Sequence, residues 1–243
     1  MESDINKLRV KIFADGADLR LIESFRGLDF IKGFTTNPSL IRSAGVKDYE
    51  KYSKEIASKI EDKSLSIEVF ADNFDLMIEQ AKTISSWSKN IYAKIPIMNT
   101  NGEFSGPVIR ELSLAGIPIN ITAIMTTKQL RASLNVINSD SKIIFSVFAG
   151  RIADTGRDPC DVMTECSNLL NGRYNSELLW ASTREIYNIF QAEKTNCDII
   201  TVGYNLLSKV NLIGKDLNDY SRETVDSFYR DAKSTRLKIL PDR

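Results

Sequence analysis

Lys94, Glu68 and Asp15 are residues whose types and positions could together act on a carbonyl compound. Each lies in or directly after a short apolar run, where an ionisable side chain is uncommon unless it is paired or functional. A neutral lysine amine attacks a carbonyl carbon, and burial favours the neutral form. A carboxylate favours the ammonium instead, so Glu68 fits a proton shuttle acting through water, and Asp15 fits an acid–base group. These residues predict amine-nucleophile chemistry.

Two arginines and a serine could bind a phosphate group. Arg151 follows the sixth predicted strand, Ser182 ends the seventh, and Arg184 follows it. The planar guanidinium group matches the geometry of phosphate oxygens. The sequence has neither a G-x-x-x-x-G-K-[ST] segment nor a dinucleotide-type glycine pattern, so a nucleotide is not indicated. We therefore expect a phosphate site formed by these three side chains.

The chain contains no histidine, which excludes histidine acid–base catalysis, Ser-His and Cys-His pairs, and nearly all zinc catalysis. The cysteines Cys160, Cys166 and Cys197 form no C-x-x-C pair, so we expect free thiols. No motif indicates a metal or a cofactor, and we expect neither. With 32 basic and 32 acidic residues, the charge indicates no nucleic-acid or membrane partner. The sequence has no run of about 18 apolar residues and no secretory signal, so we expect a cytoplasmic protein.

Strand-like runs alternate with helical stretches along the chain. The runs are Val10–Ala14, Lys32–Thr35, Leu65–Phe70, Ile91–Ile95, Pro118–Ile124, Lys142–Phe148, Leu178–Ser182 and Asp198–Val202. The helical stretches between them are Asp18–Arg26, Tyr49–Glu61, Phe74–Ser88, Phe104–Ala115, Thr127–Asn138, Asp158–Leu170 and Thr183–Lys194. This alternation predicts parallel βαβ units, and eight of them in 243 residues favour a single (β/α)8 barrel, a TIM barrel, over residues 1–243. An open doubly wound sheet is the alternative.

A long amphipathic stretch, Asp219–Lys233, predicts an extra C-terminal helix. We expect it to cover part of the barrel or to contact a neighbouring subunit, and we therefore expect a homo-oligomer. The segment Gly156–Pro159 has no role that the sequence assigns.

Polar residues end most of the predicted strands, where a barrel carries its chemistry. Besides the residues above, the strand ends carry Thr36, Asn37, Asn120, Thr122 and Ser146. Because side chains alternate along a strand, Lys94, Glu68 and Asn120 share the face opposite their apolar neighbours, which is the face toward the barrel axis. For Asn120 or Thr122 alone, a satisfied structural polar group is the simpler interpretation. A structural ion pair is the alternative for Lys94 and Glu68.

Five segments in order resemble the transaldolase family. They are the T-T-N-P-S-L segment Thr35–Leu40, the A-K-I-P segment Ala93–Pro96, the N-x-T segment Asn120–Ala123, the segment Ser146–Asp154, and the A-S-T-R segment Ala181–Arg184. The resemblance implies a barrel without a cofactor, whose lysine, here Lys94, forms a Schiff base with a ketose phosphate. It implies that Asp15 is the acid–base group for carbon–carbon cleavage, and that Glu68 and Thr122 hold a water that moves protons.

The resemblance also implies substrate contacts. The three-carbon portion would meet Thr36, Asn37, Asn120, Ser146 and Phe148, and the phosphate would meet Arg151, Ser182 and Arg184. Glu68 and Phe148 resemble the transaldolases, since the related fructose-6-phosphate aldolases typically have Gln and Tyr there. Val147 and Thr183 depart from the usual proline and phenylalanine. The function implied is transfer of a dihydroxyacetone unit between sugar phosphates.

Three alternatives stay open at this point. The chain could be an aldolase that releases free dihydroxyacetone, or a biosynthetic relative acting on an unusual sugar phosphate. It could be a non-catalytic sugar-phosphate sensor that keeps the barrel. It could also be a structural barrel in which Lys94 and Glu68 form a salt bridge.

Overall fold

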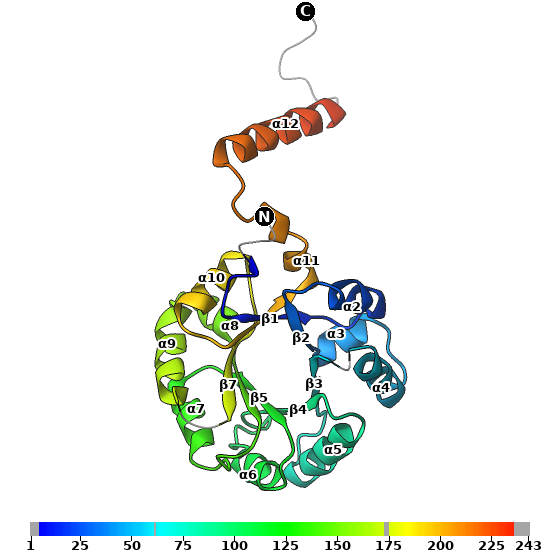
Figure 1. Cartoon of the computed structure of the whole chain (residues 1–243), viewed down its shortest axis with the longest axis vertical. Helices are drawn as coiled ribbons and strands as arrows, with labels where there is room; N and C mark the ends of the chain where they lie inside the picture. Colours follow the sequence, from blue (N-terminus) through cyan, green and yellow to red (C-terminus); the bar gives the residue numbers. More distant parts are fainter. Residues whose placement is uncertain (1–4, 61, 173–174, 236–243) are drawn as a thin grey trace, which may run out of the picture.

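The computed structural model describes residues 5–60, 62–172 and 175–235, in which eight parallel strands close into a barrel. Figure 1 shows the strands as an inner ring with helices outside it. The strands are β1 (Lys11–Asp15), β2 (Ile31–Thr35), β3 (Ser64–Glu68), β4 (Ile91–Pro96), β5 (Ile119–Ile124), β6 (Ile143–Val147), β7 (Ser176–Trp180) and β8 (Ile199–Gly203). Because β8 pairs with β1, the predicted (β/α)8 barrel is confirmed and the open-sheet alternative is wrong.

Helices alternate with the strands and cover the outside of the barrel. They are α2 (Leu19–Arg26), α3 (Pro38–Ser43), α4 (Tyr49–Lys59), α5 (Phe74–Ser86), α6 (Gly106–Leu114), α7 (Thr127–Leu134), α8 (Ala149–Ala153), α9 (Pro159–Leu170), α10 (Tyr187–Lys194), α11 (Tyr204–Leu207), the 3₁₀ helix η1 (Val210–Leu212) and α12 (Leu217–Thr235). None of the described helices has the length and apolar composition that a membrane span requires.

Short polar residues determine where several helices begin. Asn37, Asp48 and Asn73 each accept a hydrogen bond from a backbone N–H in the first turn of the helix that follows. Thr126 and Gln129 form a reciprocal capping box at the start of α7. Such caps satisfy N–H groups that have no partner within the helix. At Asn37, Asn73 and Thr126 the helix begins within a few residues of the end of the preceding strand, which keeps that strand end at the mouth of the barrel.

The register of the strands sets the level of the polar side chains. Glu68 of β3 is paired with Lys94 of β4, and Lys94 is paired with Asn120 of β5. On the other side of the barrel, Asp15 of β1 is paired with Thr35 of β2. Paired residues of adjacent parallel strands carry their side chains on the same face. The register therefore aligns Glu68 with Lys94 and Asn120, and Asp15 with Thr35, on the inner face of the barrel.

Apolar side chains occupy the inside of the barrel next to these polar groups. Phe13, Ile144, Leu179, Ala181 and Ile199 form a buried cluster against which Tyr92 and Phe148 pack. The other face of the strands belongs to the larger core between strands and helices, as Ile91, Ala93 and Ile95 show. Lys94 therefore shares the inner face with Tyr92, as the alternation of side chains predicts.

Three strands end earlier than the sequence indicates. β3, β6 and β7 end at Glu68, Val147 and Trp180, one or two residues before the predicted ends. At β7 the cause is Ser182, whose φ of +66° is a left-handed conformation that does not continue a strand.

The helix boundaries also differ from the prediction. α10 begins at Tyr187 rather than Thr183, because Asn188 Oδ1 accepts from the backbone N–H groups of Arg184 and Glu185 and holds them in a loop. The short helices α3 and α8 are additions to the prediction. The expected helix end at Glu61 lies outside the described residues, and α4 ends at Lys59.

The segment Gly156–Pro159 forms the entry to α9. Gly156 has a φ of +78°, which favours glycine, and Asp158 Oδ1 accepts from the backbone N–H of Cys160. Pro159 occupies the first turn of α9, where a missing N–H has no cost. This segment is therefore a turn and a helix cap.

The three cysteines are unpaired, and Cys166 and Cys197 are buried. Burial raises the pKa of these two thiols to about 12, so that they stay protonated at neutral pH. They pack in the core as small apolar groups.

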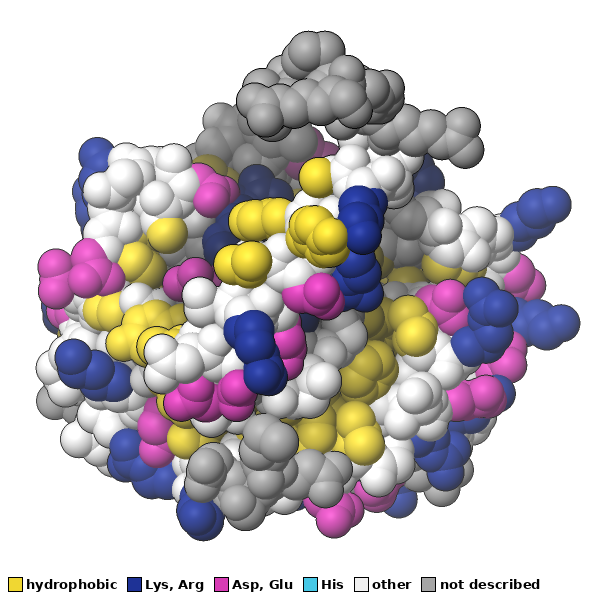
Figure 2. Space-filling model, turned by 90° about the horizontal axis from the view of Figure 1, so that it is seen from above, with side chains coloured by type: hydrophobic (Ala, Val, Ile, Leu, Met, Phe, Trp, Pro, Cys, Tyr) yellow, Lys and Arg dark blue, Asp and Glu magenta, His cyan; other side chains and the backbone are white. Residues whose placement is uncertain are grey.

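The predicted C-terminal helix is present as α12, and Figure 1 shows it set apart from the ring of strands. No residue of α12 is buried, so it does not cover the barrel within the described part of the chain. One side of α12 exposes the large hydrophobic residues Leu217, Tyr220, Val225, Phe228 and Tyr229. Figure 2, which views the molecule from the α12 end, shows hydrophobic side chains exposed among charged ones.

Candidate active site

A cavity of about 560 Å³ opens where the strands end, and all eight strands contribute residues to its lining. Functional sites of (β/α)8 barrels lie at this end. The structure brings together ten of the twelve predicted site residues here: Asp15, Asn37, Glu68, Lys94, Thr122, Ser146, Phe148, Arg151, Ser182 and Arg184. The other two, Thr36 and Asn120, are buried and do not line the cavity.

Lys94 enters the cavity from β4 and is only 7% exposed. Its Nζ lies 2.9 Å from Glu68 Oε2 and donates to the carbonyl oxygen of Thr36 at 2.8 Å. Both acceptors stabilise the ammonium form, and a buried cation that lost one of them would be strongly destabilised. The ion pair considered from the sequence is therefore present, and it lines the cavity rather than the core behind it.

Asp15 stands across the barrel from this pair and is held by threonines. Thr35 Oγ1 donates to Asp15 Oδ1 at 2.7 Å, and Thr35 Oγ1 lies 2.5 Å from Thr201 Oγ1. Because a hydroxyl has one proton, Thr35 cannot also donate to Thr201, so Thr201 donates to Thr35. Burial raises the pKa of Asp15 above its ordinary value, while the charge of Lys94 and the Thr35 hydrogen bond act in the opposite direction.

Asn120 links three strands inside the barrel, where it is buried next to the cavity. Its Nδ2 donates to Ser66 Oγ at 3.0 Å, and its Oδ1 accepts from Ser146 Oγ at 2.7 Å. These bonds fix the orientation of the amide. In the same strand, Thr122 Oγ1 is buried and has no hydrogen-bond partner among the described residues. A buried hydroxyl without a partner is costly, and Thr122 lines the cavity, so it can bind a water or a substrate oxygen.

Thr36 and Asn37 both follow β2, but they do different things. The Thr36 hydroxyl donates to the carbonyl oxygen of Ser66 at 3.2 Å, and only its own carbonyl reaches Lys94. The Thr36 side chain is therefore bonded to the backbone of β3. Asn37 lines the cavity while its side chain caps α3.

The two predicted phosphate-binding arginines stand at the mouth in different environments. The Arg151 guanidinium lies 5.6 Å from the centre of the Phe148 ring, as in a cation–π contact. Arg184 forms a two-point ion pair with Asp154, from Nε to Oδ1 at 2.9 Å and from Nη2 to Oδ2 at 2.5 Å. Both arginines line the cavity with Ser182.

Two residues in the cavity wall have strained backbones. Ala123 and Ser182 have φ values of +62° and +66°, a conformation that is uncommon for residues other than glycine. At Ala123 the pairing of β5 with β6 shifts register, directly after Thr122. Such strain costs about 1–3 kcal/mol and concentrates at functional sites.

Several lining residues are absent from the prediction, of which Thr35 and Thr201 matter most because they act on Asp15. Each is separated by two positions from an inward-facing residue, Thr35 from Gly33 and Thr201 from Ile199. The period-two alternation within these strands is therefore the signal that could have identified them.

Asp15→Asn should increase the stability of the fold at neutral pH. The raised pKa of Asp15 means that the native state binds its proton more tightly than the unfolded chain, so ionisation destabilises the fold. The stability that Asp15 contributes is present below its unfolded pKa of about 3.9 and is lost as the pH rises through the higher native value. Urea denaturation from pH 3.5 to 8 should show an advantage for the variant that disappears at the acid end. An equal advantage at every pH would contradict this account.

The sequence matches known proteins along most of its length. The sequence model of the family described as Transaldolase/Fructose-6-phosphate aldolase matches residues 12–239. A protein of Thermoanaerobacter sp. (strain X514), named "Probable transaldolase", is 32% identical over 231 residues, which are 95% of this chain and 100% of that protein. A protein of the same name from Methanococcus maripaludis (strain C5) is 30% identical over 224 residues, which are 88% of this chain and 99% of that protein.

Solved structures share the fold. KGPDC from Streptococcus mutans superposes with a TM-score of 0.55 at 10% identity, covering 82% of this chain and 89% of that chain. At this identity the likeness shows the barrel alone. The family match spans all eight strands and every residue of the cavity described above. The chain belongs to the transaldolase/fructose-6-phosphate aldolase family.

Proposed function

We propose that the protein is a transaldolase that moves a dihydroxyacetone unit from a ketose phosphate to an aldose phosphate through a Schiff base on Lys94. The observation that carries the proposal is a buried lysine amine 2.9 Å from a carboxylate, in a cavity that also holds Asp15 and two arginines. Family membership supports an enzyme of the aldolase/transaldolase type. The finer assignment rests on the chemistry of the site.

Formation of the Schiff base begins with proton transfer. The Lys94 ammonium gives a proton to Glu68, which lies within hydrogen-bond distance, and the neutral amine attacks the ketone carbon. The resulting carbinolamine loses its hydroxyl as water after Glu68 returns the proton, which leaves an iminium ion. The hydroxyl of Thr122 is suited to orient that water, because it is buried in the lining and has no other partner in the described structure.

Carbon–carbon cleavage falls to Asp15. As a carboxylate, Asp15 takes the proton from the hydroxyl on the carbon that will leave. The carbon–carbon bond then breaks, and the electron pair of that bond moves into the iminium ion. The products are an aldose phosphate and an enamine on Lys94. Attack of the enamine on an acceptor aldehyde reverses the step, with Asp15 returning the proton. The Thr35 hydrogen bond keeps one carboxylate oxygen fixed, so that the other oxygen faces the substrate.

The remaining predicted residues supply substrate binding. Asn37 and Ser146 line the cavity together with Lys94 and suit the hydroxyls of the three-carbon unit. Arg151, Ser182 and Arg184 suit a phosphate at the mouth. The substrates are therefore proposed to be sugar phosphates in the cytoplasm.

Borohydride should trap fructose 6-phosphate as a covalent adduct on Lys94. Peptide mass mapping should locate the adduct there, and Lys94→Met should lower activity by about 10³-fold or more, since it removes the nucleophile. Lys82→Met is the control, because Lys82 makes an exposed ion pair with Glu111. An adduct on another lysine would reject the proposal. A folded Lys94→Met variant with full activity would favour the structural ion pair.

Phe148 should determine whether donor cleavage waits for an acceptor. Phenylalanine has no proton to give, so the enamine persists until erythrose 4-phosphate or another aldehyde arrives. Phe148→Tyr should increase release of free dihydroxyacetone by about tenfold or more, since a positioned proton donor contributes about 10²–10⁴ to rate. Product analysis with and without erythrose 4-phosphate measures this. Acceptor-independent cleavage by the unmodified protein would favour the aldolase alternative.

We also propose a homo-oligomer in which the exposed apolar side of α12 packs on another copy. Phe228→Asp should shift the mass measured by multi-angle light scattering toward a smaller species, because it places a charge in an apolar contact. Asp226→Asn, on the opposite side of α12, should leave the mass unchanged. A monomeric mass for the unmodified protein would contradict the proposal.

A further inference from the structure

Asp154 is a motif residue to which the proposed mechanism gives no role. It directly follows α8, the short helix that also carries Arg151. Its carboxylate binds two nitrogens of Arg184, which comes from the loop after the next strand. The adjacent arginine lowers the pKa of Asp154 below its ordinary value, so the pair stays ionised across neutral pH.

The hydrogen-bond inventory of Arg184 shows what this pair leaves available. A guanidinium group has five N–H donors. Within the described residues, Nε and one N–H of Nη2 go to Asp154, and one N–H of Nη1 goes to the carbonyl oxygen of Ser182 at 3.1 Å. One N–H remains on each terminal nitrogen. Two terminal donors are what a phosphate accepts from an arginine in a bidentate contact.

Gly150 of α8 lies against the loop that carries Arg184. A Cβ placed on Gly150 would lie 1.6 Å from the carbonyl oxygen of Ser182 and 3.3 Å from Cγ of Arg184. The backbone N–H of Gly150 also donates to the carbonyl of Ala181 at 3.3 Å. Glycine at this position therefore lets α8 approach the loop after β7. The segment from α8 to Asp154 thus carries one cavity arginine and binds the guanidinium group of the other.

From this geometry we infer that Asp154 is a positioning residue that presets Arg184 for the phosphate group of the substrate. The inference rests on the proposed phosphate site. Without Asp154, the long arginine side chain would have to be ordered by each incoming substrate, at an entropic cost in binding. The expected consequence is weaker binding of phosphorylated substrates, with little change in the chemical step at Lys94.

The test compares a phosphorylated with an unphosphorylated donor. Asp154→Ala and Asp154→Asn should raise the KM for fructose 6-phosphate by about fivefold, the scale of a well-formed exposed ion pair, with kcat within about twofold. The KM for fructose, the same donor without its phosphate, should not change. Asp154→Glu should restore part of the affinity.

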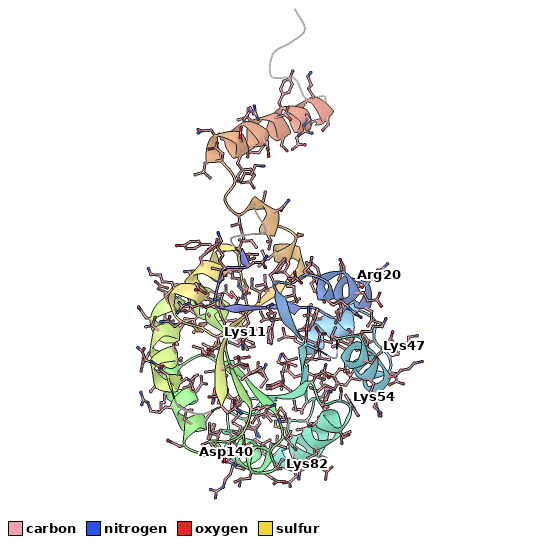
Figure 3. The ribbon with its side chains drawn as sticks, viewed as in Figure 1. Lys11, Arg20, Lys47, Lys54, Lys82 and Asp140 are labelled. Carbon is pink, nitrogen blue, oxygen red and sulfur yellow. The ribbon has the colours of Figure 1, made fainter. Side chains whose placement is uncertain are left out.

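The matched control is Glu111→Gln. Glu111 pairs with Lys82 at 2.6 Å, and the exposed fractions of that pair, 49% and 50%, match the 46% and 52% of Arg184 and Asp154. Figure 3 places Lys82 on the outer rim of the barrel. This variant should leave every KM unchanged.

Calorimetric titration with inorganic phosphate separates this inference from the proposed transferase activity, because phosphate binding does not require Lys94. Binding to the unmodified protein that weakens by about fivefold in Asp154→Ala supports the inference even if no transfer is detected. Equal or tighter binding in Asp154→Ala, or a raised KM for fructose, overturns it. Absence of phosphate binding to the unmodified protein overturns both the inference and the proposed phosphate site.

Discussion

The site depends on one buried cation. The Lys94 ammonium lies inside a ring of strands, where an unpaired charge would not persist, and it is kept there by Glu68 and the carbonyl of Thr36. Glu68 is the register partner of Lys94 on the adjacent strand β3, and Thr36 directly follows β2, the strand beyond it. A shift of one residue between β3 and β4 would turn one of the two side chains to the outer face. The closed barrel is therefore what makes a functional lysine compatible with a stable interior.

The two carboxylates in the cavity, those of Glu68 and Asp15, have different surroundings. Glu68 is in contact with the ammonium of Lys94, its proposed partner in proton exchange. Asp15 lies across the barrel, bonded to Thr35, and burial raises its pKa. Divergent environments for two titratable groups are a common basis for separate acid–base roles. The difference in the free energy of unfolding between Asp15→Asn and the unmodified protein at neutral pH is therefore the stability that the fold loses by keeping this group ionisable.

The sequence predicts the barrel and the reacting layer because both follow from simple periodicities. Alternation of strands and helices specifies the fold, and alternation of side chains specifies that Lys94 and Glu68 face inward. Boundaries were less predictable where the backbone is irregular. The run Leu178–Ser182 has strand-like residues. The left-handed conformation of Ser182 occurs where Gly150, from another unit of the barrel, approaches closely. The pairing of Arg184 with Asp154 and the exposure of α12 likewise depend on tertiary placement, which local pattern does not contain.

The same comparison separates two kinds of functional residue. Groups proposed to react stand on regular strands, where the neighbouring strands hold them to a fixed level, as with Lys94 on β4. Groups proposed to bind the phosphate follow β6 and β7, with Arg151 in the short helix α8 and Arg184 in the loop before α10. These segments lack the ladder of hydrogen bonds that fixes a strand, so their arginine side chains need other contacts to be ordered. Asp154 and the Ser182 carbonyl supply such contacts to Arg184, whereas Arg151 has the face of Phe148. Arg184, held by an ion pair, and Arg151, supported by an aromatic ring, both lie at the mouth of the cavity. Together they could bind a phosphate while leaving room for donors and acceptors of different length.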